Sequence, residues 1–112
     1  MSQLTTHILD TSSGQPAPGI EIILYQQKNA QWEILAKGKT NNDGRVADLL
    51  PKEKILEPGQ YKLKFETQPY FNKQNIQTFY PYVEISFQIT DATHYHVPLL
   101  LNPFGYTTYR GS

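Results

Sequence analysis

The alternation of apolar and polar side chains over short stretches is the feature of this sequence that most restricts its fold. Residues 83–90 alternate from end to end as VEISFQIT, and residues 61–65 repeat the pattern as YKLKF. Successive side chains of a β-strand point to opposite faces. A period of two therefore predicts strands with one buried face and one wet face.

The predicted strands are short, and turn residues separate them at intervals of about 8–12 residues. They cover residues 5–11, 20–27, 32–40, 61–65, 83–90, 94–101 and 106–110. On the first strand we expect Thr6, Ile8 and Asp10 on one face and His7 and Leu9 on the other. One helical turn is expected over residues 52–57 and a short helix within residues 71–78. The pattern predicts an all-β sandwich of about seven to eight strands in a single domain, residues 1–112.

Charge and composition remove several classes of function. Ten basic and ten acidic residues balance, so the positive field that nucleic-acid binding needs is missing. The absence of cysteine excludes disulfides, thiolate zinc sites and a cysteine nucleophile. No secretory signal is evident, and no stretch approaches the ~20 apolar residues that span a bilayer. We expect a cytoplasmic protein that binds neither nucleic acid nor membrane.

The three histidines are the first candidates for chemistry, because imidazole gains or loses a proton near neutral pH. His94 and His96 lie two residues apart on a predicted strand and therefore share a face, and His7 lies on the first strand. Three interpretations are open at this stage. The histidines are structural, or they form a zinc site of the His-x-His type, or they perform metal-free acid–base catalysis.

Arg45 and the end of the chain are the other candidates. Arg45 directly follows the turn sequence NNDG, so it is either a solvated charge or a fixed guanidinium that binds an oxyanion or a planar polar ligand. Residues 106–112, YTTYRGS, read as strand almost to the last residue. They form either an edge strand with a Gly-Ser remnant of cloning, or a tail whose Arg110, hydroxyl and terminal carboxylate enter a pocket.

Six segments, in this order, resemble a known family. They are LTTHILDT (4–11), GQPA (14–17), TNNDGR (40–45), FYP (79–81), HYHVPLL (94–100) and YTTYRGS (106–112). They are spread over essentially the whole chain and together resemble the 5-hydroxyisourate hydrolases, the transthyretin-related enzymes of purine catabolism. Asn102 and Tyr80 differ from the residues that are most frequent at these two positions in that family, and neither is one of its catalytic or substrate-binding residues.

The resemblance implies a transthyretin-like β-sandwich that forms a homotetramer, with active sites where dimers face each other and with no metal or other cofactor. It implies hydrolysis of 5-hydroxyisourate to 2-oxo-4-hydroxy-4-carboxy-5-ureidoimidazoline during urate degradation. The catalytic residues would be His7, Arg45, His96 and Ser112. The substrate-binding residues would be His7, Arg45, Tyr109, Arg110, Gly111 and Ser112.

Some questions stay open within this resemblance. It does not say whether His7 or His96 is the general base, or whether Arg110 contacts substrate or anchors the tail. It leaves His94 as a structural residue. The alternative function is a non-catalytic, transthyretin-like carrier of a small aromatic ligand.

Overall fold

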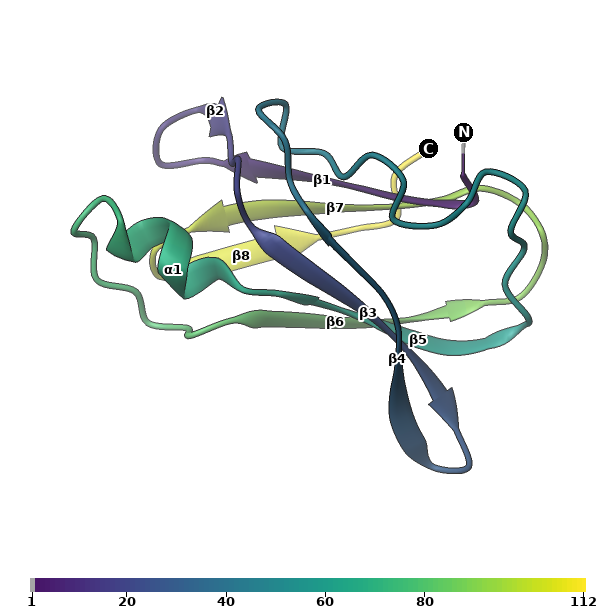
Figure 1. Ribbon diagram of the computed structural model, residues 1–112. Helices are drawn as coiled ribbons and strands as arrows, with labels where there is room; N and C mark the ends of the chain where they lie inside the picture. The colour runs from purple at the N-terminus through teal and green to yellow at the C-terminus, as the bar shows by residue number, and fades with distance from the viewer. Residues whose placement is uncertain (1) are drawn as a thin grey trace.

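Two four-stranded β-sheets lie face to face in the computed structural model, which describes residues 2–112 (Figure 1). One sheet has the strand order β2-β1-β7-β8 and the other has the order β4-β3-β5-β6. The elements are β1 (Leu4–Asp10), β2 (Gln15–Pro16), β3 (Glu21–Lys28), β4 (Gln31–Lys39), β5 (Gly59–Phe65), α1 (Thr67–Asn72), β6 (Val83–Ile89), β7 (Tyr95–Asn102) and β8 (Gly105–Thr108). The described residues thus form the all-β sandwich with a short helix that the alternation predicts.

The facing sides of the two sheets form the core. Ile8 and Leu99 from one sheet, and Ile22, Leu24 and Leu63 from the other, have no exposed surface. Burying an aliphatic side chain of this size stabilises the fold by about 1.5–3 kcal/mol. Because successive side chains of a strand point to opposite faces, burying these side chains fixes which residues of the same strands face outward.

The pairing of β1 with β7 positions the residues that matter for function. The two strands come from opposite ends of the chain and run parallel, with Thr5 beside His96 and His7 beside Pro98. The buried residues of β1 alternate with half-buried ones, and Thr5 and His7 belong to the half-buried set. Thr5, His7 and His96 therefore share the outer face of this sheet, as the sequence predicts for His7.

The two helical predictions differ from the structure. Residues 52–57 form a single turn, in which the backbone N–H of Lys54 donates to the carbonyl of Pro51 at 3.1 Å, and then a segment without regular structure. Leu56 is buried and its backbone N–H donates to Oε1 of Gln3 at 2.8 Å, while the neighbouring Ile55 is exposed. The N–H of Leu56 is therefore bonded outside the segment and not to a helical neighbour.

The helix that does form lies earlier than predicted, at Thr67–Asn72 rather than within residues 71–78. Pro69 sits in its first turn, where a helix has no partner for the backbone N–H and proline is tolerated. The backbone ends the helix at residues 73–75, with Asn75 at a φ of 58°. No helix in the described part of the chain combines the length and apolar character that a bilayer-spanning helix needs.

Candidate functional site

The turn before Arg45 attaches this residue to the edge of β1. The side-chain Oδ1 of Asn41 accepts the backbone N–H of Asp43 at 2.9 Å and that of Arg45 at 3.1 Å. The carbonyl of Gly44 then accepts the N–H of Ile8 at 2.9 Å. As a result, Arg45 forms an antiparallel bridge with His7.

Gly44 allows this close approach because it lacks a side chain. Its φ is 73°, in the left-handed region that only glycine adopts freely. A Cβ at this position would lie 2.4 Å from the carbonyl oxygen of Ile8 and 3.1 Å from Cβ of Pro16. The NNDG turn therefore places the guanidinium-bearing residue against the first strand.

The tail reaches the same face from the other side of the sheet. In the β7–β8 pairing, Leu99 lies opposite Thr108, and the same register carried three residues further sets His96 opposite Gly111. The backbone N–H of Gly111 donates to the carbonyl of His96 at 2.8 Å. The predicted strand 106–110 is interrupted after Thr108, where the register would require Pro98 to donate a backbone N–H that proline lacks.

Gly111 also holds the ring of His96. A Cβ on Gly111 would lie 2.6 Å from Cδ2 of that ring and 3.3 Å from its Cγ, so only glycine leaves the imidazole this space. The order across the outer face of the sheet is thus Arg45, His7 on β1, His96 on β7, and Gly111 with the adjacent Ser112 in the tail. Four of the predicted residues and the end of the tail meet on one face.

Thr5 is a site residue that the sequence analysis missed. Its Oγ1 lies 2.8 Å from Nε2 of His94 and 2.8 Å from Nδ1 of His96. The two imidazoles are nearly parallel, at 24°, with centroids 6.3 Å apart. A threonine in a strand is ordinary, and only the pairing of β1 with β7 reveals that its hydroxyl joins two histidines.

The surroundings of His96 favour its neutral form. Burial lowers its pKa below the usual value for histidine, and the charges of Arg45, His94 and His7 lower it further, while a hydrogen bond to the backbone of Thr5 has the opposite effect. A neutral imidazole at neutral pH can accept a proton. Arg45, which donates hydrogen bonds and stays charged, is suited to stabilise developing negative charge.

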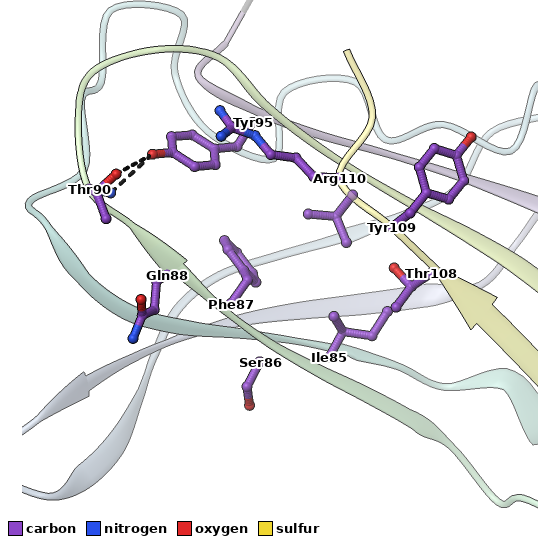
Figure 2. A pocket seen from close by; sticks show the side chains of 10 residues that line it. Ile85, Ser86, Phe87, Gln88, Thr90, Tyr95, Thr108, Tyr109 and Arg110 are labelled. Carbon is purple, nitrogen blue, oxygen red and sulfur yellow. Dashed lines mark hydrogen bonds between the residues drawn. The ribbon is translucent and has the colours of Figure 1, made fainter.

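Arg110 points to the inner side of the tail. Its Nη2 donates to Oγ1 of Thr93 at 3.4 Å and to the carbonyl of His94 at 3.3 Å. Its guanidinium carbon lies 4.1 Å from the centre of the Tyr95 ring, a cation–π contact. Figure 2 shows the side chains of Arg110 and Tyr109 leaving the tail in different directions.

A cavity of about 420 Å³ lies beneath this part of the tail, between β6 and the edge of the other sheet (Figure 2). Residues 85–88, Val97, Tyr109 and Arg110 contribute to its lining, whereas none of the three histidines does. The cavity and the histidine face are therefore two different places. On the histidine face, His7 and His96 are half-buried, and Arg45 and Ser112 are exposed.

The described residues 2–112 contain no group of three or more histidine, aspartate or glutamate side chains with the geometry of a metal site. The hydroxyl of Thr5 contacts Nε2 of His94 and Nδ1 of His96, so these two ring nitrogens already have a hydrogen-bond partner. The arrangement supplies a neutral imidazole, a second imidazole and a guanidinium on one open face.

Known proteins are similar to this chain in both sequence and fold. The mouse 5-hydroxyisourate hydrolase is 50% identical over 114 residues, covering 99% of this chain and 96% of the relative. The crystal structure of the Klebsiella pneumoniae 5-hydroxyisourate hydrolase is 39% identical with a TM-score of 0.85, covering 99% of this chain and 100% of that one. Sea bream transthyretin, solved in complex with thyroxine, is 29% identical with a TM-score of 0.91, covering 97% and 94%.

One family model matches nearly the whole chain and includes every predicted site residue except Ser112. The model of the HIUase/Transthyretin family matches residues 4–111. These include Arg45 with its turn, the histidines of β1 and β7, and Gly111 of the tail. The chain therefore belongs to the HIUase/Transthyretin family.

Proposed function

We propose that this chain hydrolyses 5-hydroxyisourate to 2-oxo-4-hydroxy-4-carboxy-5-ureidoimidazoline in urate degradation. It would act as a single domain, residues 1–112, in the cytoplasm. The observation that carries the proposal is the meeting of His7, Arg45, His96 and the tail on one face. Relatives named as 5-hydroxyisourate hydrolases, 50% and 39% identical over 99% of the chain, support it.

The reaction adds water to a ring carbonyl and breaks the adjacent carbon–nitrogen bond. Water is a weak nucleophile at neutral pH, so a base must take its proton as the oxygen attacks. His7 and His96 are the bases within reach of a ring bound on this face. Arg45 stabilises the negative charge that develops on the carbonyl oxygen, a contribution worth about 2.7–4 kcal/mol of barrier for a positioned donor in other enzymes.

The tail completes the binding surface for the planar substrate. Backbone groups of Gly111, the hydroxyl of Ser112 and the ring of Tyr109 bind the polar edge and face of the urate-like ring. Ser112 acts by positioning the substrate, since no Ser-His-Asp arrangement surrounds it among the hydrogen bonds of the described residues. The contacts of Arg110 with Thr93 and His94 support the anchoring role for that residue.

The ultraviolet absorbance of freshly made 5-hydroxyisourate tests the proposal. Purified protein is expected to speed its decay well above the spontaneous rate, with and without a chelator. His96→Ala is expected to lower kcat/KM by at least about 100-fold, because a positioned acid or base contributes about 10²–10⁴-fold. Gln31→Ala, in the exposed β3–β4 hairpin of the other sheet, is the control. Decay at the spontaneous rate with wild-type protein would refute the function.

A carrier function is the alternative from another class. The sea bream transthyretin has the higher TM-score, 0.91, yet its identity of 29% is below that of either hydrolase. The fold thus suits both functions, whereas the sequence is nearer to the hydrolases. Tight binding of an aromatic ligand with no turnover of 5-hydroxyisourate would favour the carrier.

The active form is proposed to be a homotetramer with its sites where two dimers face each other. The histidine face is open, with Arg45 and Ser112 exposed, and a second copy would exclude water from it. Light scattering is expected to give about four times the 12.9 kDa of one chain. A fully active species with the mass of one chain would contradict this assembly.

A further inference from the structure

One hydroxyl group links two imidazoles beside the proposed reaction centre. Thr5 Oγ1 is 2.8 Å from Nε2 of His94 and 2.8 Å from Nδ1 of His96. A threonine hydroxyl has one proton to donate, and its oxygen accepts through two lone pairs. When both rings are neutral, either one of them donates to Thr5 while the other accepts from it, or both donate and the hydroxyl proton has no partner among the described residues.

Two arrangements satisfy both contacts and also give the hydroxyl proton a partner. In the first, His94 donates through Nε2, Thr5 donates to Nδ1 of His96, and the proton of His96 lies on its Nε2. In the second, Nδ1 of His96 carries the proton and donates to Thr5, and Thr5 donates to Nε2 of His94. The second arrangement leaves Nε2 of His96 without a proton, as a general base requires.

The surroundings of His96 favour the second arrangement. Nδ1 of His96 faces Thr5 at 2.8 Å, and the backbone of Thr5 acts on the pKa of the ring in the direction that favours protonation. Thr5 thus occupies the Nδ1 side of the ring, and Gly111 of the tail lies against Cδ2 and Cγ on the other side. Nε2, which is bonded to Cδ2, is the ring nitrogen that Thr5 leaves free for the reaction.

Burial and the charges around His96 limit the ring to one proton. Burial and the positive charge of Arg45, together with His94 and His7, disfavour the doubly protonated ring. One ring nitrogen is then bare, and the contact of the Thr5 hydroxyl with Nδ1 selects which one it is. The side chain of Thr5 is itself restricted, because β-branched residues have few χ1 rotamers in a strand.

We propose that Thr5 and His94 are positioning residues that hold His96 as the Nδ1-protonated tautomer, so that its bare Nε2 is the general base that deprotonates the attacking water. The proton passes from water to Nε2 as the new carbon–oxygen bond forms, and it is returned to the departing ring nitrogen as the carbon–nitrogen bond breaks. The catalytic half of this inference rests on the proposed function, whereas the tautomer does not.

Long-range ¹H–¹⁵N correlation spectra of uniformly ¹⁵N-labelled protein test the tautomer directly, because protonated and bare ring nitrogens have well separated ¹⁵N shifts. Wild-type His96 is expected to show a protonated Nδ1 and a bare Nε2. In His94→Phe, which keeps an aromatic ring but removes the acceptor of Thr5, the Thr5 proton turns to His96 and the tautomer is expected to invert. A wild-type spectrum with a bare Nδ1 would overturn the proposal.

Kinetics of matched threonine variants test the consequence. Thr5→Val keeps the shape of the side chain but removes the hydroxyl, and kcat is expected to fall by about 10- to 100-fold, within the range of one acid–base group, with KM changed little. Thr5→Ser is expected to restore both the tautomer and most of kcat. Thr107→Val makes the same change at an exposed position of β8 and is expected to match the wild type.

The outcomes separate this inference from the function. If Thr5→Val and Thr107→Val share one His96 tautomer and one kcat, the inference is refuted even though hydrolysis stands. If the spectra show the expected tautomer in a wild-type protein that does not hydrolyse 5-hydroxyisourate, the hydrogen-bond assignment is supported and the function is refuted. Near-ultraviolet circular dichroism confirms that each variant is folded, and His94→Phe gives a second route should Thr5→Val be unstable.

Discussion

Deletion of residues 109–112 is expected to bring the decay of 5-hydroxyisourate down to the spontaneous rate while the two sheets stay folded. The deletion removes the residues assigned to substrate binding in the tail, and it removes Gly111, whose backbone bonds to His96. The ring of His96 then loses its neighbour at the Cδ2 edge. Both binding and the orientation of the proposed base are lost together.

Stability should suffer much less than activity. The tail contributes one backbone hydrogen bond to β7, two long and exposed side-chain hydrogen bonds from Arg110 to Thr93 and His94, and one cation–π contact from Arg110 to Tyr95. A hydrogen bond is worth about 0.5–1.5 kcal/mol and an exposed cation–π contact about 0.5–1 kcal/mol, against about 5–15 kcal/mol for a typical domain. The unfolding midpoint in urea and the activity are therefore measured on the same preparation.

A point substitution tests whether the close contact of Gly111 with His96 matters when the tail is still present. Gly111→Ala places a Cβ 2.6 Å from Cδ2 of His96, so the ring or the tail must move. Gly105→Ala is the matched control in β8, where the added Cβ meets only side-chain atoms of Asn102 at 3.8 Å. Gly111→Ala should lose activity and Gly105→Ala should keep it. Normal turnover by the deletion variant would mean that the tail has no part in the reaction.

Gly44→Ala is expected to destabilise the protein by about 3–5 kcal/mol and to displace Arg45 from His7. Two costs combine at this position. The backbone φ of 73° is strained by about 1–2 kcal/mol for a residue with a side chain. The new Cβ would also lie 2.4 Å from the carbonyl oxygen of Ile8, and neither backbone can move without breaking the bond from Ile8 to Gly44.

A second glycine isolates the contribution of the contact. Gly19 has nearly the same φ, 76°, but nothing lies within 4 Å of an added Cβ. Gly19→Ala should therefore lose only the about 1–2 kcal/mol of backbone strain and should keep its activity. Equal unfolding free energies for the two variants, measured in urea, would show that the approach of Gly44 to β1 is not tight.

The sheet could be predicted from sequence because its strands obey a local rule. Burial along β1 alternates as expected from LTTHILD, with Ile8 and Asp10 inside and His7 outside. The two helical predictions were wrong for reasons that the local pattern does not show. Over residues 52–57, the backbone N–H of Leu56 donates to the side chain of Gln3, which is far away in the sequence. The helix starts at Thr67 because Pro69 fits a first turn, although proline usually marks an end.

The site could be predicted only in part, and for a similar reason. Spacing placed His94 and His96 on one face but left structural, zinc and acid–base interpretations open. The selection of His7, Arg45, His96 and the tail came from the family resemblance. The link through Thr5 could not be read from either source, because it joins residues 91 positions apart in the chain.

The parallel pairing of β1 with β7 also determines when in folding the site can exist. Thr5 and His96 meet across a separation of 91 residues, and Arg45 joins them only after its turn has docked on β1. Contacts this distant in sequence close late and make folding slow, because a long loop must be ordered first. During refolding, activity is therefore expected to return only when β1 and β7 have paired.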